Sequence, residues 1–108
     1  MIIGDDMLDI DIDSKYGILF VRLFGTLNKE TSKNLNKEVT KLLDDVGINN
    51  IVINIQNLSN IDMYGIKSLK RCYKICKNSL LCVNPNQISK IEDLKYVTDE
   101  LSAVRLNT

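Results

Sequence analysis

The chain has 108 residues, of which 44% are apolar and 26% charged, as is typical of one folded domain rather than of a disordered or fibrous chain. Fourteen Lys and Arg residues balance fourteen Asp and Glu residues, so no net charge draws the protein to nucleic acid or to an anionic membrane. We therefore expect a single domain over residues 1–108 that makes no direct contact with nucleic acid.

The N-terminal segment predicts a cytoplasmic protein. Acidic residues follow Met1–Gly4, where a secretory signal would carry a basic region and then a long apolar run. No segment approaches the roughly 20 apolar residues that a membrane helix needs. We therefore expect neither export nor contact with a membrane.

The three cysteines, Cys72, Cys76 and Cys82, form an odd set, which favours reduced thiols that are buried as small hydrophobic side chains. The spacing of Cys72 and Cys76 would place two metal ligands on one helical face. A four-coordinate zinc site needs further ligands, however, and the sequence contains no His. We therefore expect no metal and no cofactor.

The first half of the chain predicts a β-hairpin, a helix and a buried strand. Leu8–Asp13 alternates between apolar and acidic residues, as in a strand with one face in water, and Ile18–Phe24 is nearly all apolar, as in a strand covered on both faces. Asn28 is a good cap for a helix that Gly47 ends. Ile51–Ile55 is a β-branched run typical of a central strand. The core face of the helix carries Leu35, Val39, Leu42, Leu43 and Val46.

The second half continues the alternation of helices and strands. A polar turn at Asn57–Asp62 leads into a helix over Met63–Lys77, and Leu80–Val83 predicts another strand. Asn84–Gln87 combines a capping Asn with Pro at the first helical position, which indicates a further helix. Ala103–Leu106 fits either a last edge strand or a continuation of that helix. Together the elements predict an α/β fold: a mixed, mostly parallel sheet, opened by a β-hairpin, with helices packed against it.

The helix predicted at Met63–Lys77 has two contrasting faces. Its apolar arc consists of Gly65, Ile66, Leu69, Cys72, Tyr73 and Cys76, and its basic face of Lys67, Lys70, Arg71, Lys74 and Lys77. Met63 projects among the basic residues and should be at least partly exposed. A solvated helix face would account for the basic stripe. The alternative is a docking surface, which an exposed Met beside Tyr64 and a charge cluster favours.

Three segments resemble the STAS domain family. Asn57–Ile66 resembles the family's loop and helix start, in which an aliphatic-Asp-Ser-Ser/Thr-Gly-aliphatic core follows the central strand. Gly25–Asn28 resembles the Gly-x-Leu-Asp after the second strand, and Val83–Pro85 resembles the strand-to-helix Asn-Pro. Because the order and spacing agree over nearly the whole chain, the resemblance implies a single STAS-like domain of the anti-sigma factor antagonist type.

One position departs from the family pattern. In the bacterial anti-sigma factor antagonists that this chain resembles, the Ser directly after the Asp is phosphorylated by a partner kinase that is also the anti-sigma factor. Asp62 and Gly65 occupy the family's Asp and Gly positions, but Met63 stands where that Ser would be and Tyr64 where the second hydroxyl residue would be. Since Met cannot accept phosphate, the resemblance supports the fold and the binding surface more than a kinase-controlled switch.

The resemblance implies a non-catalytic regulator of bacterial transcription signalling that sequesters an anti-sigma factor or a related kinase-like protein. The usual catalytic constellations are missing from the sequence, which predicts no enzyme. The alternative is a structural STAS subunit that acts by homo-oligomerisation without a phosphorylation switch. Modification of Tyr64, Ser59 or Ser68 instead of Met63 is left open. The residues expected to bind the partner are Ser59, Asp62, Met63, Tyr64, Lys67, Lys70, Arg71 and Lys74.

Overall fold

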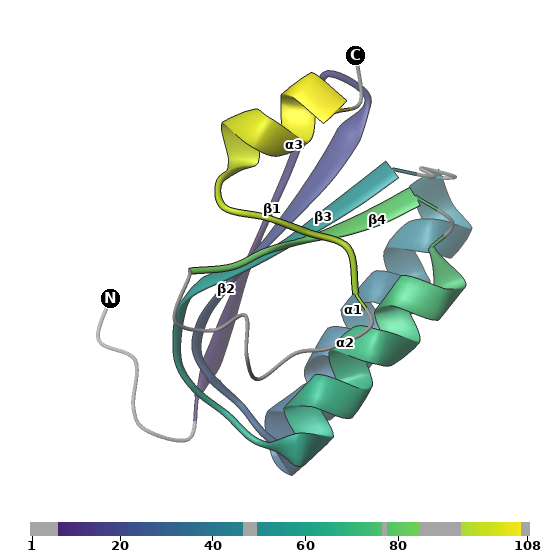
Figure 1. Ribbon diagram of the computed structural model, residues 1–108. Helices are drawn as coiled ribbons and strands as arrows, with labels where there is room; N and C mark the ends of the chain where they lie inside the picture. Colours follow the sequence, from purple (N-terminus) through teal and green to yellow (C-terminus); the bar gives the residue numbers. More distant parts are fainter. Residues whose placement is uncertain (1–6, 47–49, 77, 85–93, 107–108) are drawn as a thin grey trace.

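The computed structural model describes residues 7–46, 50–76, 78–84 and 94–106. Five strands form one sheet in the order β1-β2-β3-β4-β5, with β1 antiparallel to β2 and every other neighbouring pair parallel (Figure 1). This arrangement confirms the predicted mixed, mostly parallel sheet opened by a hairpin. The strands are β1 (Leu8–Lys15), β2 (Ile18–Leu27), β3 (Asn50–Ile61), β4 (Asn78–Cys82) and β5 (Tyr96–Val97).

Helices cover both faces of this sheet. The long helices α1 (Lys29–Val46) and α2 (Met63–Ile75) lie side by side on one face, and the short helix α3 (Glu100–Leu106) lies on the other (Figure 1). No helix in the described ranges is long and apolar enough to cross a membrane.

The β1–β2 hairpin turns through two residues, Tyr16 and Gly17, both of which have positive φ angles, 56° and 72°. Two successive positive φ angles are what a type I′ turn requires, and such a turn matches the twist of the strands that it joins. Gly17 adopts this conformation without the steric cost that a Cβ would bring. The hairpin predicted from the sequence is therefore confirmed.

Strand β2 is buried on both faces because each face meets a different helix layer. Leu19, Val21 and Leu23 belong to the larger core beneath α1 and α2, whereas Ile18 and Phe20 belong to a smaller core that Ala103 of α3 helps to close. Alternate side chains of a strand point to opposite faces, so two covered faces require a nearly continuous apolar run. The prediction for Ile18–Phe24 is thus confirmed.

Two further predictions concern the apolar faces of α1 and β3. Leu35 and Val39 are buried in the larger core and Leu42 packs against it, as the helical spacing predicts, and Ile51–Ile55 is buried. The side chains of Leu43 and Val46, as well as Gly47 and Lys77, lie outside the described part of the chain. The same applies to residues 85–93 and so to most of the helix predicted from Asn84 onward.

The prediction of a polar turn at Asn57–Asp62 is wrong. Strand β3 continues to Ile61 and stays paired with β2, which itself extends to Leu27, through two irregularities in register. Within this extension Leu58 and Ile61 pack against the core, whereas Asn57, Ser59 and Asn60 are exposed. The polar residues that suggested a turn are therefore the solvent-exposed positions at the end of a strand.

Neither alternative proposed for Ala103–Leu106 is correct. These residues are part of α3, and the edge strand is Tyr96–Val97, which pairs in parallel with β4. Because β5 precedes α3 directly, α3 does not continue the preceding predicted helix. The Asp99 carboxylate accepts the N–H of Ser102 at 2.7 Å and marks the start of the helix, a local capping signal that the prediction overlooked.

Polar contacts with Arg22 hold helix α3 to the sheet, beside the apolar contacts of Ala103 and Val104. The Nε and Nη2 atoms of Arg22 each donate to Glu100 at 2.8 Å, and Asn54 donates to the same carboxylate at 2.7 Å. The remaining Arg22 nitrogen, Nη1, binds Asp11 at 3.0 Å and Asp13 at 3.3 Å. The acidic row of β1, predicted to face water, thus supplies two of the three carboxylates that surround this guanidinium.

We expect Glu100→Gln to lower the free energy of unfolding by about 1–3 kcal/mol near neutral pH, the range for hydrogen bonds to charged groups. Donation by Arg22 holds the pKa of Glu100 below its ordinary value of 4.5. The stabilisation is therefore complete above that ordinary value and is lost as the pH falls through the lowered one. Urea denaturation at a series of pH values measures both effects. Glu30→Gln, on exposed α1 surface, is the control, and an equal loss there would contradict the prediction.

Candidate functional site

The candidate site is built around Asp62, the residue between β3 and α2. Its backbone is extended, with φ −106° and ψ −175°, and its Oδ1 atom accepts the N–H of Gly65 at 2.9 Å. The Asp62 N–H in turn donates to the carbonyl of Leu27, at the end of β2, at 3.2 Å. Asp62 therefore caps α2, as the sequence predicts, and also ties the start of this helix to the neighbouring strand.

Gly65 is required by the close approach of α2 to β2. A Cβ atom at this position would lie 2.5 Å from the carbonyl oxygen of Leu27 and 2.9 Å from Cγ1 of Ile61. The first distance is far inside van der Waals contact, and the backbone oxygen cannot rotate away as a flexible side chain can. The family's Gly position thus has a physical reason in this chain.

Helix α1 begins beside α2 at the same end of the sheet (Figure 1). Asn28 Oδ1 accepts the Thr31 N–H at 3.0 Å, and Thr31 Oγ1 accepts the Asn28 N–H at 2.9 Å, so the two residues cap the helix reciprocally. The predicted cap at Asn28 is confirmed. Because β2 and β3 are parallel neighbours, they finish at the same end of the sheet, and the helices that follow them both start there.

The shared helix end exposes an apolar and aromatic surface. Met63 is 62% exposed, which confirms the predicted exposure, and Tyr64 is 44% exposed. The ammonium groups of Lys29 and Lys67 lie 5.5 and 5.8 Å from the centre of the Tyr64 ring, within the range of cation–π attraction. Lys29 was absent from the predicted site because it belongs to α1, far from Tyr64 in the sequence.

The predicted basic face of α2 is largely exposed. Lys67, Arg71 and Lys74 are exposed and Lys70 is half-buried. None of the four forms an ion pair with a carboxylate of the described residues. Lys67 lies beside Met63 and Tyr64 at the helix start, whereas Arg71 lies further along, against α1.

The three hydroxyl residues considered as modification sites differ in access. Ser59 is exposed on β3 and Tyr64 is partly exposed, but Ser68 is only 3% exposed and donates to Asn36 Oδ1 of α1 at 2.8 Å. Ser68 therefore faces the neighbouring helix, in an environment that a projection of α2 alone does not reveal. Of these three hydroxyl groups, only those of Ser59 and Tyr64 lie on exposed side chains.

The cysteines are free and buried, as predicted. Burial, reinforced by the neighbouring Cys76, raises the pKa of the Cys72 thiol to about 12, and burial raises that of Cys82 to about 11. Thiols with such pKa values are weak nucleophiles at neutral pH. Among the described residues no group of three or more His, Cys, Asp or Glu side chains is gathered as a metal site requires.

The fold and the site define a small α/β domain whose hairpin-edged sheet carries two helices that start together at an exposed, basic end. A model of the STAS domain family matches residues 9–99, and the chain belongs to this family. The resemblance seen in the sequence is thereby confirmed.

Several solved structures share the fold. An anti-sigma factor antagonist from Mycobacterium paratuberculosis superimposes with a TM-score of 0.75 at 17% identity, over 96% of this chain and 99% of that one. SpoIIAA, a Bacillus cell fate determinant, in its unphosphorylated form gives 0.70 at 16% identity, over 92% and 98%. A Ser-to-Glu variant of RsbS from Moorella thermoacetica gives 0.71 at 14% identity, over 91% and 96%. Identities this low establish the common fold alone.

Asp62→Ala should lower the free energy of unfolding by about 0.5–2 kcal/mol, because the Gly65 N–H loses its acceptor. Thermal or chemical denaturation measures the change. Asp62→Asn, which keeps an acceptor oxygen, should recover most of the loss. If the alanine variant unfolds at the midpoint of the natural protein, the capping bond does not contribute to stability.

Gly65→Ala should also destabilise the protein, by about 1–3 kcal/mol, since the added methyl group meets the Leu27 carbonyl. A loss of stability would be informative, because at an unhindered helical position Ala is more favourable than Gly by about 1 kcal/mol. Met63→Ala, an exposed change two residues earlier in the same helix, should stay within about 0.5 kcal/mol and serves as the control. A Gly65→Ala variant more stable than the natural protein would show that α2 can move off β2 at no cost.

Proposed function

We propose that this protein is a single-domain regulator of the anti-sigma factor antagonist type, which binds an anti-sigma factor or a related kinase-like protein through the start of α2. The observation that carries the proposal is the exposed Met63 and Tyr64 beside the ammonium groups of Lys29 and Lys67. Apolar anchors rimmed by charge are the usual anatomy of a protein interface. The shared fold with anti-sigma factor antagonists supports the same reading.

The buried thiols accord with a reducing compartment, and we place the regulator in the bacterial cytoplasm. Binding needs no catalytic group in this proposal. The capped helix start fixes the backbone of the contact surface before the partner arrives, which reduces the ordering cost of association.

Met63 makes the surface independent of phosphorylation at the family's Ser position. Its side chain follows the cap at a helix N-terminus, where free amides and the helix dipole would help to hold a phosphate. A phosphate there would add nearly two negative charges next to the Asp62 carboxylate and would change the field at the interface. A thioether leaves that field unchanged and adapts its shape to a partner. The natural protein is therefore permanently competent to bind.

The test uses a purified histidine-kinase-like anti-sigma factor from the same organism. The natural protein should bind it equally with and without prior incubation with ATP, and its intact mass should not change. Met63→Ser should gain the mass of one phosphate and then release the partner. Met63→Glu should weaken binding at least tenfold, because it removes the apolar anchor and adds a charge beside Asp62.

Leu101→Glu is the matched control, since Leu101 is 59% exposed on α3, across the sheet from α2. Equal losses for Leu101→Glu and Met63→Glu would contradict a contact at the helix start. A phosphate on Ser59 or Tyr64 of the natural protein, followed by release, would show that the switch has moved. Self-association in sedimentation, without affinity for such a partner, would favour a structural subunit instead.

A further inference from the structure

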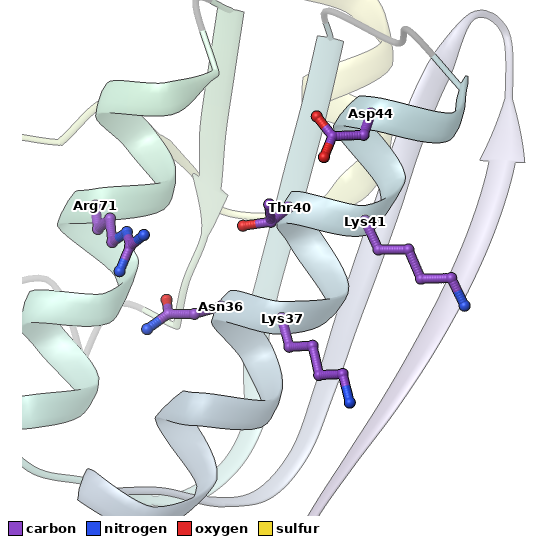
Figure 2. Close-up of a pocket in the computed structure, with 6 residues that line it drawn as sticks. All are labelled: Asn36, Lys37, Thr40, Lys41, Asp44 and Arg71. Carbon is purple, nitrogen blue, oxygen red and sulfur yellow. The ribbon is translucent and has the colours of Figure 1, made fainter.

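A shallow groove of about 510 Å³ lies between α1 and α2. Figure 2 shows Asn36, Thr40 and Asp44 on the side of α1 that faces α2, with Arg71 of α2 opposite them. Lys37 and Lys41, which also border the groove, extend away from α2. The groove is open to solvent because Thr40, Asp44 and Arg71 are exposed.

Arg71 is the principal donor in this groove, and it forms no ion pair with the described residues. By contrast, Arg22 on β2 contacts three carboxylates. A guanidinium presents a planar fork of N–H groups that matches a carboxylate in two parallel hydrogen bonds. The exposed fork of Arg71 is therefore free to bind a carboxylate of another molecule.

Asn36 adds a second donor whose orientation is fixed. Its Oδ1 atom accepts the buried Ser68 hydroxyl at 2.8 Å, and its side chain projects from α1 toward α2 (Figure 2). The amide nitrogen forms no hydrogen bond with the described residues and is therefore available to a ligand in the groove. The Thr40 hydroxyl lies one helical turn further along the same wall. The groove thus has the cation of Arg71 on its α2 side and the neutral donors Asn36 and Thr40 on its α1 side.

We propose that this groove receives an Asp or Glu side chain of the partner protein, whose carboxylate binds the Arg71 fork and the Asn36 amide nitrogen. The proposal rests on the proposed function for the existence of the partner and adds the chemistry of its contact. Lys67, Lys70 and Lys74 share α2 with Arg71, and α2 contains no acidic residue, so the surroundings attract negative charge.

A single carboxylate fits the groove better than a polyanion does. Asp44 lines the same groove, so a nucleic acid strand laid along it would bring phosphates against a carboxylate. One acidic side chain that enters at Arg71 avoids that contact. The protein's net charge of zero likewise gives a nucleic acid no general attraction.

One partner can reach both the groove and the helix start. Arg71 follows Met63 by eight residues, which corresponds to about 12 Å along the helix axis. A protein interface of ordinary size buries about 800 Å² on each side, enough to cover both positions. Ser68 has no access to the partner and acts as a positioning residue for Asn36.

The test needs no natural partner, because a short peptide rich in Glu can act as the probe, with the same peptide carrying Gln in place of Glu as its control. The signals followed by NMR are the Arg71 Nε–H and the Asn36 side-chain amide. Both should shift with the Glu peptide and not with the Gln peptide. Arg71→Gln should weaken the binding at least fivefold, whereas Lys33→Gln, which removes the same charge from an exposed position of α1 that does not line the groove, should change it less than twofold.

Ser68→Ala should reduce the Asn36 shift while the Arg71 shift persists, an outcome that a purely structural role would not give. Equal losses in Arg71→Gln and Lys33→Gln would overturn the proposal, because the general positive field of the surface would then account for the binding. Equal shifts with both peptides, or none with either, would also overturn it. Since Met63 variants with the kinase-like partner test the proposed function separately, failure of either idea is distinguishable from failure of the other.

Discussion

The first turn of α2 lies so close to the end of β2 that the Leu27 carbonyl accepts the Asp62 N–H and leaves no space for a side chain at Gly65. Much of the site geometry follows from this contact. It holds the start of α2 at the end of β2, and the Asn28 cap begins α1 at the same end of the sheet. Two segments far apart in the sequence therefore expose their first residues together, which brings Lys29 of α1 to the Tyr64 ring.

The charges of the chain cancel in sum but are separated in space. On the α3 side of the sheet, Arg22 is enclosed by carboxylates from β1 and α3, so its charge is neutralised locally. On the other side, all the charged residues of α2 are basic, and none of them forms an ion pair with a carboxylate of the described residues. A net charge of zero thus excludes a global field and still permits a local positive surface, where binding by charge complementarity is most effective.

Features set by local sequence could be predicted, and features set by pairs of distant residues could not. The hairpin, the buried strands and the caps at Asn28 and Asp62 follow from period, turn and capping signals within a few residues. The Arg22–Glu100 contact joins residues 78 positions apart, and a near-continuous apolar run gives no sign that its one Arg is enclosed. The environment of Ser68 could not be predicted for the same reason. A helical projection of α2 separates the face toward the sheet from the face toward solvent, but it does not show that α1 packs alongside.

Under the proposed function, the basic face of α2 and the residue at position 63 act on the same quantity, the field that an acidic partner meets. A phosphate at that position would carry about 1.5–2 negative charges at neutral pH, and it would offset nearly half of the four positive charges on α2. Met63 leaves those charges unopposed. Because attraction for the partner is then constant, occupancy follows only the concentrations of the two proteins relative to their dissociation constant. A regulator of this kind responds to how much of it is made, whereas a serine in place of Met63 would let it respond to a kinase.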